Sequence, residues 1–433
     1  TTRTSATTRT AAAIITITRL AGEMYDVPID GFTDGTDALQ LTQEEKDLLA
    51  MARENFDKVI VLINSTNAMQ CDFLTDDSYG VDAALWIGYT GTWGLNAVAD
   101  ILTGEVNPSG HLVDTYCNDN STAPSLVNFY GTQYANATED NNAEWYDFML
   151  DGNKYYNVYS EGIYIGYRYY ETRYEDAVLG QGNAGDYDYN ANVAYPFGYG
   201  LSYTTFDWSN FKSSYDAATD SFNVSVDVKN TGSVAGTEIV QLYVAKKNSE
   251  LFRPAKELKG FARVTLAPGE KQRITIMLDD KAFRFWNVKA NRWEIEGGEY
   301  ELLVGASVED IRLCEKISVH GTATVHPYED VDLDCYYKGD VLSVSDADFE
   351  KLLGHPIPNG KTKIDRNLTL GELNHARSPL GWLVWLVLTI LLDASYKRGK
   401  PDLNILFQYN MPLRALAKMT NGAISMGMVD GIV

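Results

Sequence analysis

Residues 11–26 (AAAIITITRLAGEMYD) decide how the rest of the chain is interpreted. Three isoleucines lie among threonines in a short β-branched run that is closed by a glycine, a pattern typical of a buried strand in a parallel sheet. The chain leaves this strand at Arg19, and Glu23 follows. Open α/β sheets carry their chemistry just beyond the carboxyl ends of the strands. Glu23 is therefore a candidate proton donor, and a solvated loop glutamate is the competing interpretation.

Residues 11–117 alternate strand and helix patterns. Thr42 and Glu45 form a capping box that predicts a helix from Thr42 to about Phe56. Gly104 ends a second apolar helix. This alternation predicts an α/β sandwich with a mostly parallel sheet. Further strands are predicted at residues 58–64, 83–88 and 111–115, and the second helix at 92–103.

Residues 118–200 are polar and rich in Gly, Asn and Tyr. Glycines among aromatics predict a long loop that packs against the fold, and the aromatics argue against low-complexity disorder. Residues 205–320 then change to strict alternation with turns every 8–12 residues, as in FNVSVDV at 222–228. That pattern predicts a β-sandwich of about seven strands, similar to an immunoglobulin or fibronectin type III domain.

The last third of the chain predicts a partly helical extension. A helix is expected at residues 343–353 and another at 413–419. Residues 380–392 are apolar throughout, which is shorter than the ~20 residues that span a bilayer. A helix packed on a partner surface is favoured, and membrane contact is the alternative. The predicted domains are residues 1–204 with the linking loop, 205–322 and 323–433.

Composition narrows the class of protein. A formal charge of −23 argues against nucleic-acid or anionic-membrane partners, which need a basic surface. Abundant Tyr and Trp suit either carbohydrate contact or β-sandwich cores. The four cysteines are too sparse for a disulfide scaffold; Cys314 and Cys335 could pair, but buried thiols are favoured. Five Asn-X-Ser/Thr sites matter only in a glycosylating host. An extracellular or cell-surface location is expected, with a cytoplasmic one left open.

The ends of the chain and its short motifs predict whether it is part of a longer polypeptide and whether it binds a cofactor or a metal. Residues 1–10 have no apolar core and are not a signal peptide. Both ends look cut, so we expect the chain to be part of a longer polypeptide. The sequence has no metal-ligand spacing, no GxSxG elbow, no Walker loop and no GxGxxG. We therefore expect no cofactor and no metal, which leaves carboxylate chemistry in loops beside strand ends.

Several stretches carry a resemblance to a known family. Residues 19–26 (RLAGEMYD) resemble the "SGEGYDR"-type loop of glycoside hydrolase family 3, which includes many β-glucosidases. Residues 104–112 (GEVNPSGHL) resemble its "GxxNPSGKLP" turn. Further matches to the family are found at residues 161–170 (EGIYIGYRYY), 196–204 (PFGYGLSYT), 230–243 and 258–261 of its fibronectin-like domain, and 367–372.

The resemblance implies a two-domain active site for a retaining, exo-acting β-glucosidase-like enzyme. A (β/α)-barrel would supply an aspartate nucleophile, and by motif position Glu23 would be the general acid/base. Tyr25 and Asp26 are weaker candidates for substrate binding, with loop solubility as the alternative for Asp26. Met24 replaces the family's usual glycine, and Val27 stands where arginine is frequent, which puts the loop geometry in doubt. No barrel sequence is found, so a partner chain or segment would have to supply it.

Such an enzyme needs two carboxyl groups about 5–5.5 Å apart. One attacks the anomeric carbon, and the other must be protonated, which requires a pKa raised by burial or by its ionised neighbour. The expected partners are a β-linked glycoside and the barrel, and a homo-oligomer stays open. The competing hypothesis is a non-catalytic carbohydrate-binding or scaffolding module.

Structural roles are expected for other prominent residues. Glu161 and Arg168 are predicted to hold the linking loop through an ion pair and stacked tyrosines, with substrate contact as the alternative. Cys71 is predicted to be a buried thiol. Three tryptophans are predicted to be core residues rather than sugar platforms: Trp86, Trp93 and Trp286.

Overall fold

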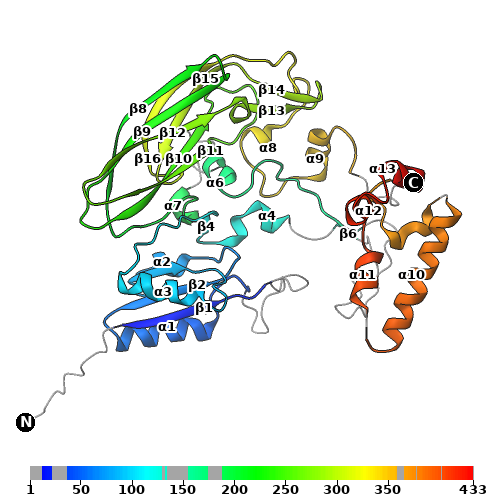
Figure 1. Cartoon of the computed structure of the whole chain (residues 1–433), viewed down its shortest axis with the longest axis horizontal. Coiled ribbons are helices and arrows are strands. Elements are labelled where there is room, and N and C mark those ends of the chain that lie inside the picture. Colours follow the sequence, from blue (N-terminus) through cyan, green and yellow to red (C-terminus); the bar gives the residue numbers. More distant parts are fainter. Residues whose placement is uncertain are drawn as a thin grey trace, which may run out of the picture. The chain divides into compact units, whose positions relative to one another are not determined.

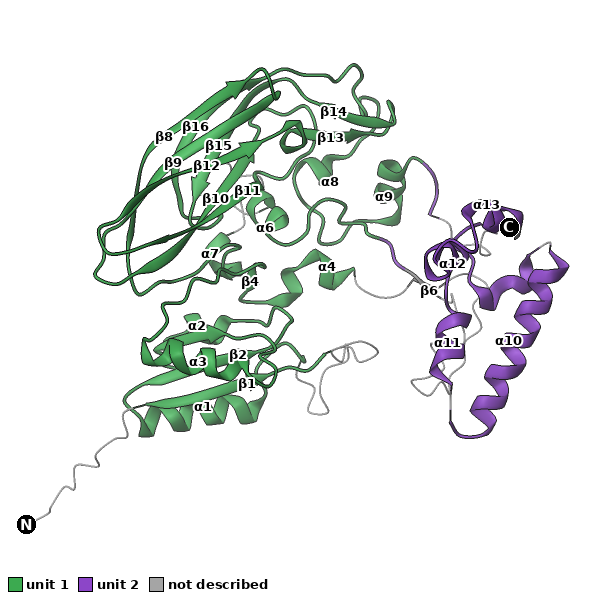
Figure 2. Ribbon diagram, viewed as in Figure 1, with its two compact units in different colours: residues 1–128, 159–354 green, residues 129–158, 355–433 purple. Residues whose placement is uncertain are grey.

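The computed structural model divides the chain into two compact units, coloured separately in Figure 2. Unit 1 comprises residues 1–128 and 159–354, and unit 2 comprises residues 129–158 and 355–433. The structure describes residues 12–21, 37–128, 132–133, 155–173, 188–357, 365–376, 378–400 and 402–432. Glu23, Tyr25 and Asp26 lie outside the described residues.

Unit 1 begins with a three-stranded parallel sheet in the order β1-β2-β3 (Figure 1). The parallel sheet was predicted, but β1 is buried on only one of its faces. Helix α1 buries Leu49 on the face of the sheet that carries Ile15 and Ile17. The opposite face leaves Ile14 55% exposed, so the prediction of a fully buried strand is wrong there. The bounds are β1 Ala13–Thr18, α1 Gln43–Asn55, β2 Val59–Asn64, α2 Asp72–Thr75, β3 Ala83–Trp86 and α3 Gly94–Thr103.

The predicted ends of the helices match the structure. Thr42 caps α1, and the reciprocal bonds of its capping box with Glu45 are both present. Gly104 ends α3 in the left-handed conformation, at φ 80°. The strand predicted at residues 111–115 is wrong, because the only strand pairing in that region is the two-residue β4 (Tyr116–Cys117), which pairs with β7 (Val193–Tyr195). Short elements follow at η1 Asn120–Thr122 and α4 Pro124–Val127.

The described parts of the tyrosine-rich region (residues 118–128, 155–173 and 188–200) pack as predicted, and some of them are helical. Helix α6 (Tyr167–Arg173) and helix α7 (Tyr189–Asn192) were not predicted. Tyr164 is fully buried in a cluster of aromatics and donates a hydrogen bond from its hydroxyl to the Tyr336 carbonyl at 2.5 Å. Tyr164 thus serves as a core side chain with a satisfied hydroxyl.

Seven long strands form the predicted sandwich in two antiparallel sheets, ordered β11-β10-β15-β16 and β12-β9-β8 (Figure 1). Inward-facing residues such as Val226, Val228 and Leu242 alternate with outward ones and fill a single core. The bounds are β8 Phe206–Asp216, β9 Ser221–Asn230, β10 Gly236–Ala245, β11 Glu257–Leu266, β12 Lys271–Leu278, η2 Asp280–Ala282, β15 Gly298–Gly305 and β16 Ile311–Val319. The hairpin of β13 (Arg284–Asn287) and β14 (Arg292–Ile295) lies at one end of the sandwich (Figure 1).

All four cysteines are free thiols. Cys71 is buried as predicted, whereas Cys314 is exposed on β16 and Cys335 is half-buried, so the expectation of buried thiols is wrong for Cys314. Unit 1 ends with two short helices that follow the sandwich in sequence, α8 (Asp334–Tyr337) and α9 (Asp346–Leu353).

Unit 2 is built mainly from helices, in line with the predicted C-terminal extension. Its core contains Leu370, Leu373 and Leu413, against which one side of α10 packs. By length and composition α10 could cross a membrane, and 22% of its most apolar window is buried within the structure. The bounds are β5 Thr132–Gln133, β6 Tyr155–Tyr156, η3 Leu370–His375, α10 Pro379–Lys397, α11 Leu403–Tyr409, α12 Leu413–Met419 and α13 Met426–Ile432.

Candidate functional site

The candidate site lies where the three parallel strands end. Thr18 of β1 pairs with Asn64 of β2, and Ile63 pairs with Trp86 of β3, so the strands end side by side. We call the positions that follow Thr18, Asn64 and Trp86 the carboxyl edge. Such an edge is where open α/β sheets bind their ligands.

Arg19 is the first residue beyond β1, and it is buried. Its guanidinium forms a two-point ion pair with Glu45 of α1, with Nη1–Oε1 and Nη2–Oε2 distances of 2.8 Å each. It also donates to the carbonyls of Ala38 and Gln40, each at 2.5 Å. Because these partners follow residues 22–36 in sequence and Arg19 precedes them, one side chain ties together both flanks of the segment that contains Glu23.

Tyr89 anchors the last described residues before that segment. Its hydroxyl accepts a hydrogen bond from the Ala21 N–H at 2.7 Å. The same hydroxyl lies 3.0 Å from the Arg19 carbonyl and 3.1 Å from the Ala21 carbonyl, and it can donate its one proton to either. The loop that carries Tyr89 is held in turn by Asn64, whose side-chain amide donates to the Gly88 carbonyl. The strand exit is therefore anchored by its neighbours on the carboxyl edge.

Two tryptophans near this edge contradict their prediction as core residues. Trp86 is 40% exposed and donates its indole N–H to the Ser65 carbonyl at 2.7 Å, while Trp93 is 78% exposed. Trp86 lies on β3, which is an edge strand of the three-stranded sheet: no further strand pairs with it in the described residues. Trp286, the third of the set, is 43% exposed on the β13–β14 hairpin.

The predicted site residues cannot be placed at this edge, because Glu23, Tyr25 and Asp26 are outside the described residues. Sequence reasoning missed the residues that support the edge, namely Glu45, Asn64 and Tyr89. A usable signal existed for one pair only: Arg19 directly follows a strand, and Glu45 was already recognised as part of a capping box. Among the described residues, no group of three His, Cys, Asp or Glu side chains could hold a metal ion.

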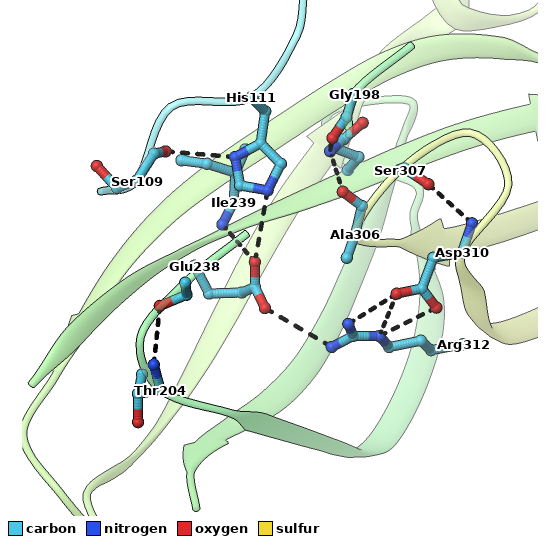
Figure 3. Close-up of polar contacts among 12 residues, drawn as sticks. Ser109, His111, Gly198, Thr204, Glu238, Ile239, Ala306, Ser307, Asp310 and Arg312 are labelled. Atoms are coloured by element: carbon cyan, nitrogen blue, oxygen red, sulfur yellow. Dashed lines mark hydrogen bonds and ion pairs between the residues drawn. The ribbon is translucent and has the colours of Figure 1, made fainter. Parts of the chain in front are cut away.

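A second polar cluster joins the GEVNPSGHL turn to the sandwich (Figure 3). His111 Nε2 lies 3.8 Å from Glu238 Oε1, and Arg312 Nη1 lies 3.6 Å from Glu238 Oε2. Asp310 pairs with the far side of the Arg312 guanidinium at 2.8 Å. Burial lowers the pKa of His111 and raises that of Glu238. Because the cluster fills a contact between packed elements, we assign it to stabilising that contact.

The PFGYGLSYT motif serves the same contact. Gly198 has φ +80°, and a Cβ there would lie 2.0 Å from Gln241 Oε1. The Gln241 amide donates to the Gly198 carbonyl at 2.9 Å and to the Ala306 carbonyl at 2.5 Å. At Gly200 a Cβ would lie 2.5 Å from the Gly110 carbonyl oxygen. The motif's glycines are therefore explained by close packing of this loop against the sandwich.

The linking loop is held differently from its prediction. Arg168 pairs with Glu257 of β11 at 3.4 Å, whereas Glu161 is buried and accepts a hydrogen bond from the Asn128 amide at 3.2 Å. Stacking contributes as expected, because Tyr167 stacks on Phe197 with ring centroids 4.5 Å apart and ring planes 27° from parallel. Both charged residues therefore have structural roles, as expected. They bind other residues rather than forming an ion pair with each other.

Comparison with known proteins identifies the domains. Residues 1–167 match the glycosyl hydrolase family 3 C-terminal domain, and residues 238–308 match a fibronectin type III-like domain. The chain is 40% identical over 231 residues to thermostable beta-glucosidase B of Acetivibrio thermocellus, covering 53% of this chain and 26% of that protein. It is 31% identical over 291 residues to an exo-alpha-(1->6)-L-arabinopyranosidase of Bifidobacterium breve, covering 67% of this chain and 33% of that protein.

Solved structures give the same result. Beta-glucosidase 3B from Thermotoga neapolitana, in complex with alpha-D-glucose, superposes with a TM-score of 0.56 at 33% identity. The match covers 71% of this chain and 37% of that one. The chain thus spans only a part of each of these relatives, and no (β/α)-barrel is present among the residues that the structure describes. The chain carries the C-terminal domain of glycosyl hydrolase family 3, followed by a fibronectin type III-like domain.

Proposed function

We propose that this chain supplies the general acid/base of a retaining, exo-acting β-glucosidase-like glycoside hydrolase, and that Glu23 is that residue. The observation that carries the proposal is the anchoring of the carboxyl edge. Arg19 and Tyr89 hold the backbone on the amino-terminal flank of residues 22–36, and Arg19 also binds the opposite flank. The match of residues 1–167 to the family's C-terminal domain supports it.

The mechanism follows from the chemistry of two carboxyl groups. The nucleophile would come from a barrel on another chain or segment and would attack the anomeric carbon. Glu23 would donate a proton to the leaving oxygen and would then accept one from the water that hydrolyses the glycosyl-enzyme intermediate. A solvated glutamate has a pKa of about 4.3 and is a poor acid at neutral pH. The barrel must therefore close over Glu23 and raise its pKa.

The test is Glu23→Gln in the assembly that contains every native chain or segment. Turnover of a glycoside with a poor leaving group should fall by about 10²–10⁴-fold, since general acid–base catalysis contributes that much. An aryl glycoside with an acidic leaving group should be affected less in its first step. Glu105→Gln is the matched control, because Glu105 is an exposed glutamate in the same domain. Near wild-type turnover of both substrates by the Glu23→Gln variant would refute the assignment.

The competing function is a non-catalytic carbohydrate-binding or scaffolding module. Purification from the native source separates the two hypotheses. A co-purifying barrel of ~30–40 kDa, sized for a domain of that class, supports the enzyme. A lone species with sugar affinity and no hydrolysis supports the module.

A further inference from the structure

The β13–β14 hairpin carries two exposed tryptophans that face each other. Trp286 and Trp293 are directly paired across the strands, so their side chains lie on the same face of the hairpin. Their rings meet edge to face at a centroid distance of 5.5 Å. Trp286 is 43% exposed and Trp293 59% exposed. Large aromatic side chains that remain in solvent together commonly mark a binding surface.

A hollow of about 320 Å³ lies beside Trp293. This volume is near the lower end of the roughly 300–1,000 Å³ of ligand sites, which suits a small cyclic ligand. The wall combines one aromatic side chain, one aliphatic side chain and several polar groups. The lining residues are Asp280, Arg284, Arg292, Trp293, Ile295 and Thr322.

Buried partners orient the first of the two arginines. Arg292 donates from Nε and Nη2 to Glu294 Oε1, at 2.8 and 2.6 Å. Glu294 is only 1% exposed, and its other oxygen accepts a hydrogen bond from the Asn287 amide at 2.6 Å. The buried Glu294 carboxylate therefore fixes the guanidinium of Arg292, whose side chain stays 58% exposed. A pre-oriented planar donor loses little entropy when it binds a ligand.

The second arginine pairs with a carboxylate that is 38% exposed, that of Asp280. Arg284 donates from Nε to Asp280 Oδ2 at 2.9 Å, and its Nη2 also contacts that oxygen. Thr322 accepts a hydrogen bond from the Ile295 N–H at 2.9 Å, so its hydroxyl proton can still be donated. The hollow thus presents donors from two guanidinium groups and a hydroxyl, together with acceptor capacity on Asp280.

This combination fits one ligand chemistry best. Each arginine is already paired with a carboxylate, so the lining offers no uncompensated positive charge to select a phosphate or a uronate. Vicinal hydroxyls of a sugar both donate and accept hydrogen bonds, and the apolar face of a pyranose ring can lie against an indole. We propose that this hollow is a non-catalytic subsite for a neutral sugar unit of a glycan chain.

Direct binding measurements on the full chain test the subsite. Calorimetric titration with cellopentaose, a neutral β-linked glucan oligomer, should show binding; this choice of probe rests on the proposed function. Trp293→Ala should weaken binding at least about tenfold, which corresponds to 1.4 kcal/mol. Trp293→Phe keeps an aromatic face and should stay within about threefold. Arg292→Lys keeps the charge but loses the planar fork, and should also weaken binding.

The control is Phe261→Ala, because Phe261 is an exposed aromatic (69%) on β11 of the same sandwich. It should bind like the wild type. Absence of binding by the wild type, or equal binding by Trp293→Ala, would overturn the subsite. A preference for an oligogalacturonate over cellopentaose would overturn the neutral-sugar assignment.

Glu23→Gln separates this inference from the proposed function. The variant should keep its affinity for cellopentaose, because the subsite does not use Glu23. If Glu23→Gln removes all binding while Trp293→Ala keeps it, sugar binds only at the candidate catalytic site and the subsite is refuted. If Trp293→Ala loses binding while Glu23→Gln leaves turnover of the complete assembly unchanged, the subsite stands and the acid/base assignment fails.

Discussion

Arg19 and Glu45 form a parallel two-point ion pair in which both N–O distances are 2.8 Å. The Arg19 side chain is 5% exposed and the Glu45 side chain 20% exposed. Glu45 also accepts a hydrogen bond from the Thr42 N–H at 2.9 Å, so one carboxylate caps α1 and holds the exit of β1. The first turn of a helix and the end of a neighbouring strand are thereby fixed to each other.

Arg19→Met should destabilise the chain by about 3–5 kcal/mol, because removing one member of a buried pair leaves the other charge uncompensated. Denaturant unfolding followed by circular dichroism measures this. The double variant Arg19→Met/Glu45→Gln should cost less than the sum of the single changes, because the orphaned charge is gone. Additive effects of the two substitutions would contradict the coupling inferred from the geometry.

Tyr89→Phe removes the hydroxyl that binds the backbone of Ala21 and Arg19. Loss of stability should be modest, about 1 kcal/mol, because Tyr89 is 45% exposed and water can replace part of the contact. If the proposed function holds, kcat in the complete assembly should fall about 10- to 100-fold through misplacement of the following segment. Tyr203→Phe is the matched control, since its hydroxyl donates to the Ile101 carbonyl at 2.9 Å in the same domain. Equal effects of the two variants would argue against a positioning role for Tyr89.

Local patterns in the sequence predicted the elements whose causes are local. The Thr42 capping box begins α1, Gly104 ends α3, and strict alternation identifies the strands of the sandwich. The failures have tertiary causes. Ile14 lies on the face of the sheet opposite α1, and Trp86 lies on β3, which is an edge strand of the described sheet; hydrophobicity along the chain reveals neither position.

The candidate site was predictable only as a motif. Glu23 was identified from its place after a strand and from the family resemblance, whereas the groups that support the carboxyl edge come from other segments. Tyr89 lies 68 residues from Ala21 in sequence, and no spacing rule connects them. The paired tryptophans on the hairpin were missed for a related reason: a cross-strand pair becomes visible only when the register of β13 and β14 is known.

His111 should make folding sensitive to mild acid. Burial lowers its pKa in the folded state below the usual 6.5, against an opposing contribution from its hydrogen bond to the Ser109 carbonyl, and Arg312 lowers it further. The unfolded chain then binds the proton more readily, so this contribution to stability is present above pH 6.5 and is lost as the pH falls below that value.

Denaturation midpoints at pH 7.5 and pH 5.5 test the effect of His111. His111→Gln should lose less stability across this interval than the wild type. Glu238 opposes the trend, because burial raises its pKa and favours its protonated form in the folded state as the pH falls. His320→Gln, at an exposed histidine on the sandwich, should behave like the wild type. Parallel pH profiles for wild type and His111→Gln would refute the assignment.

Gly198 and Gly269 offer a matched pair for separating backbone strain from steric crowding. Their φ angles are +80° and +77°, but a Cβ at Gly198 would lie 2.0 Å from Gln241 Oε1, whereas a Cβ at Gly269 meets nothing within 4 Å. Gly269→Ala should therefore cost only the left-handed strain, about 1–2 kcal/mol. Gly198→Ala should cost about 1–3 kcal/mol more, because Gln241 must move and lose its hydrogen bonds to two carbonyls. Chemical denaturation of both variants measures the difference. Equal losses would mean that Gln241 repacks without penalty, and the close approach of this loop to the sandwich would then not explain why the motif carries glycine.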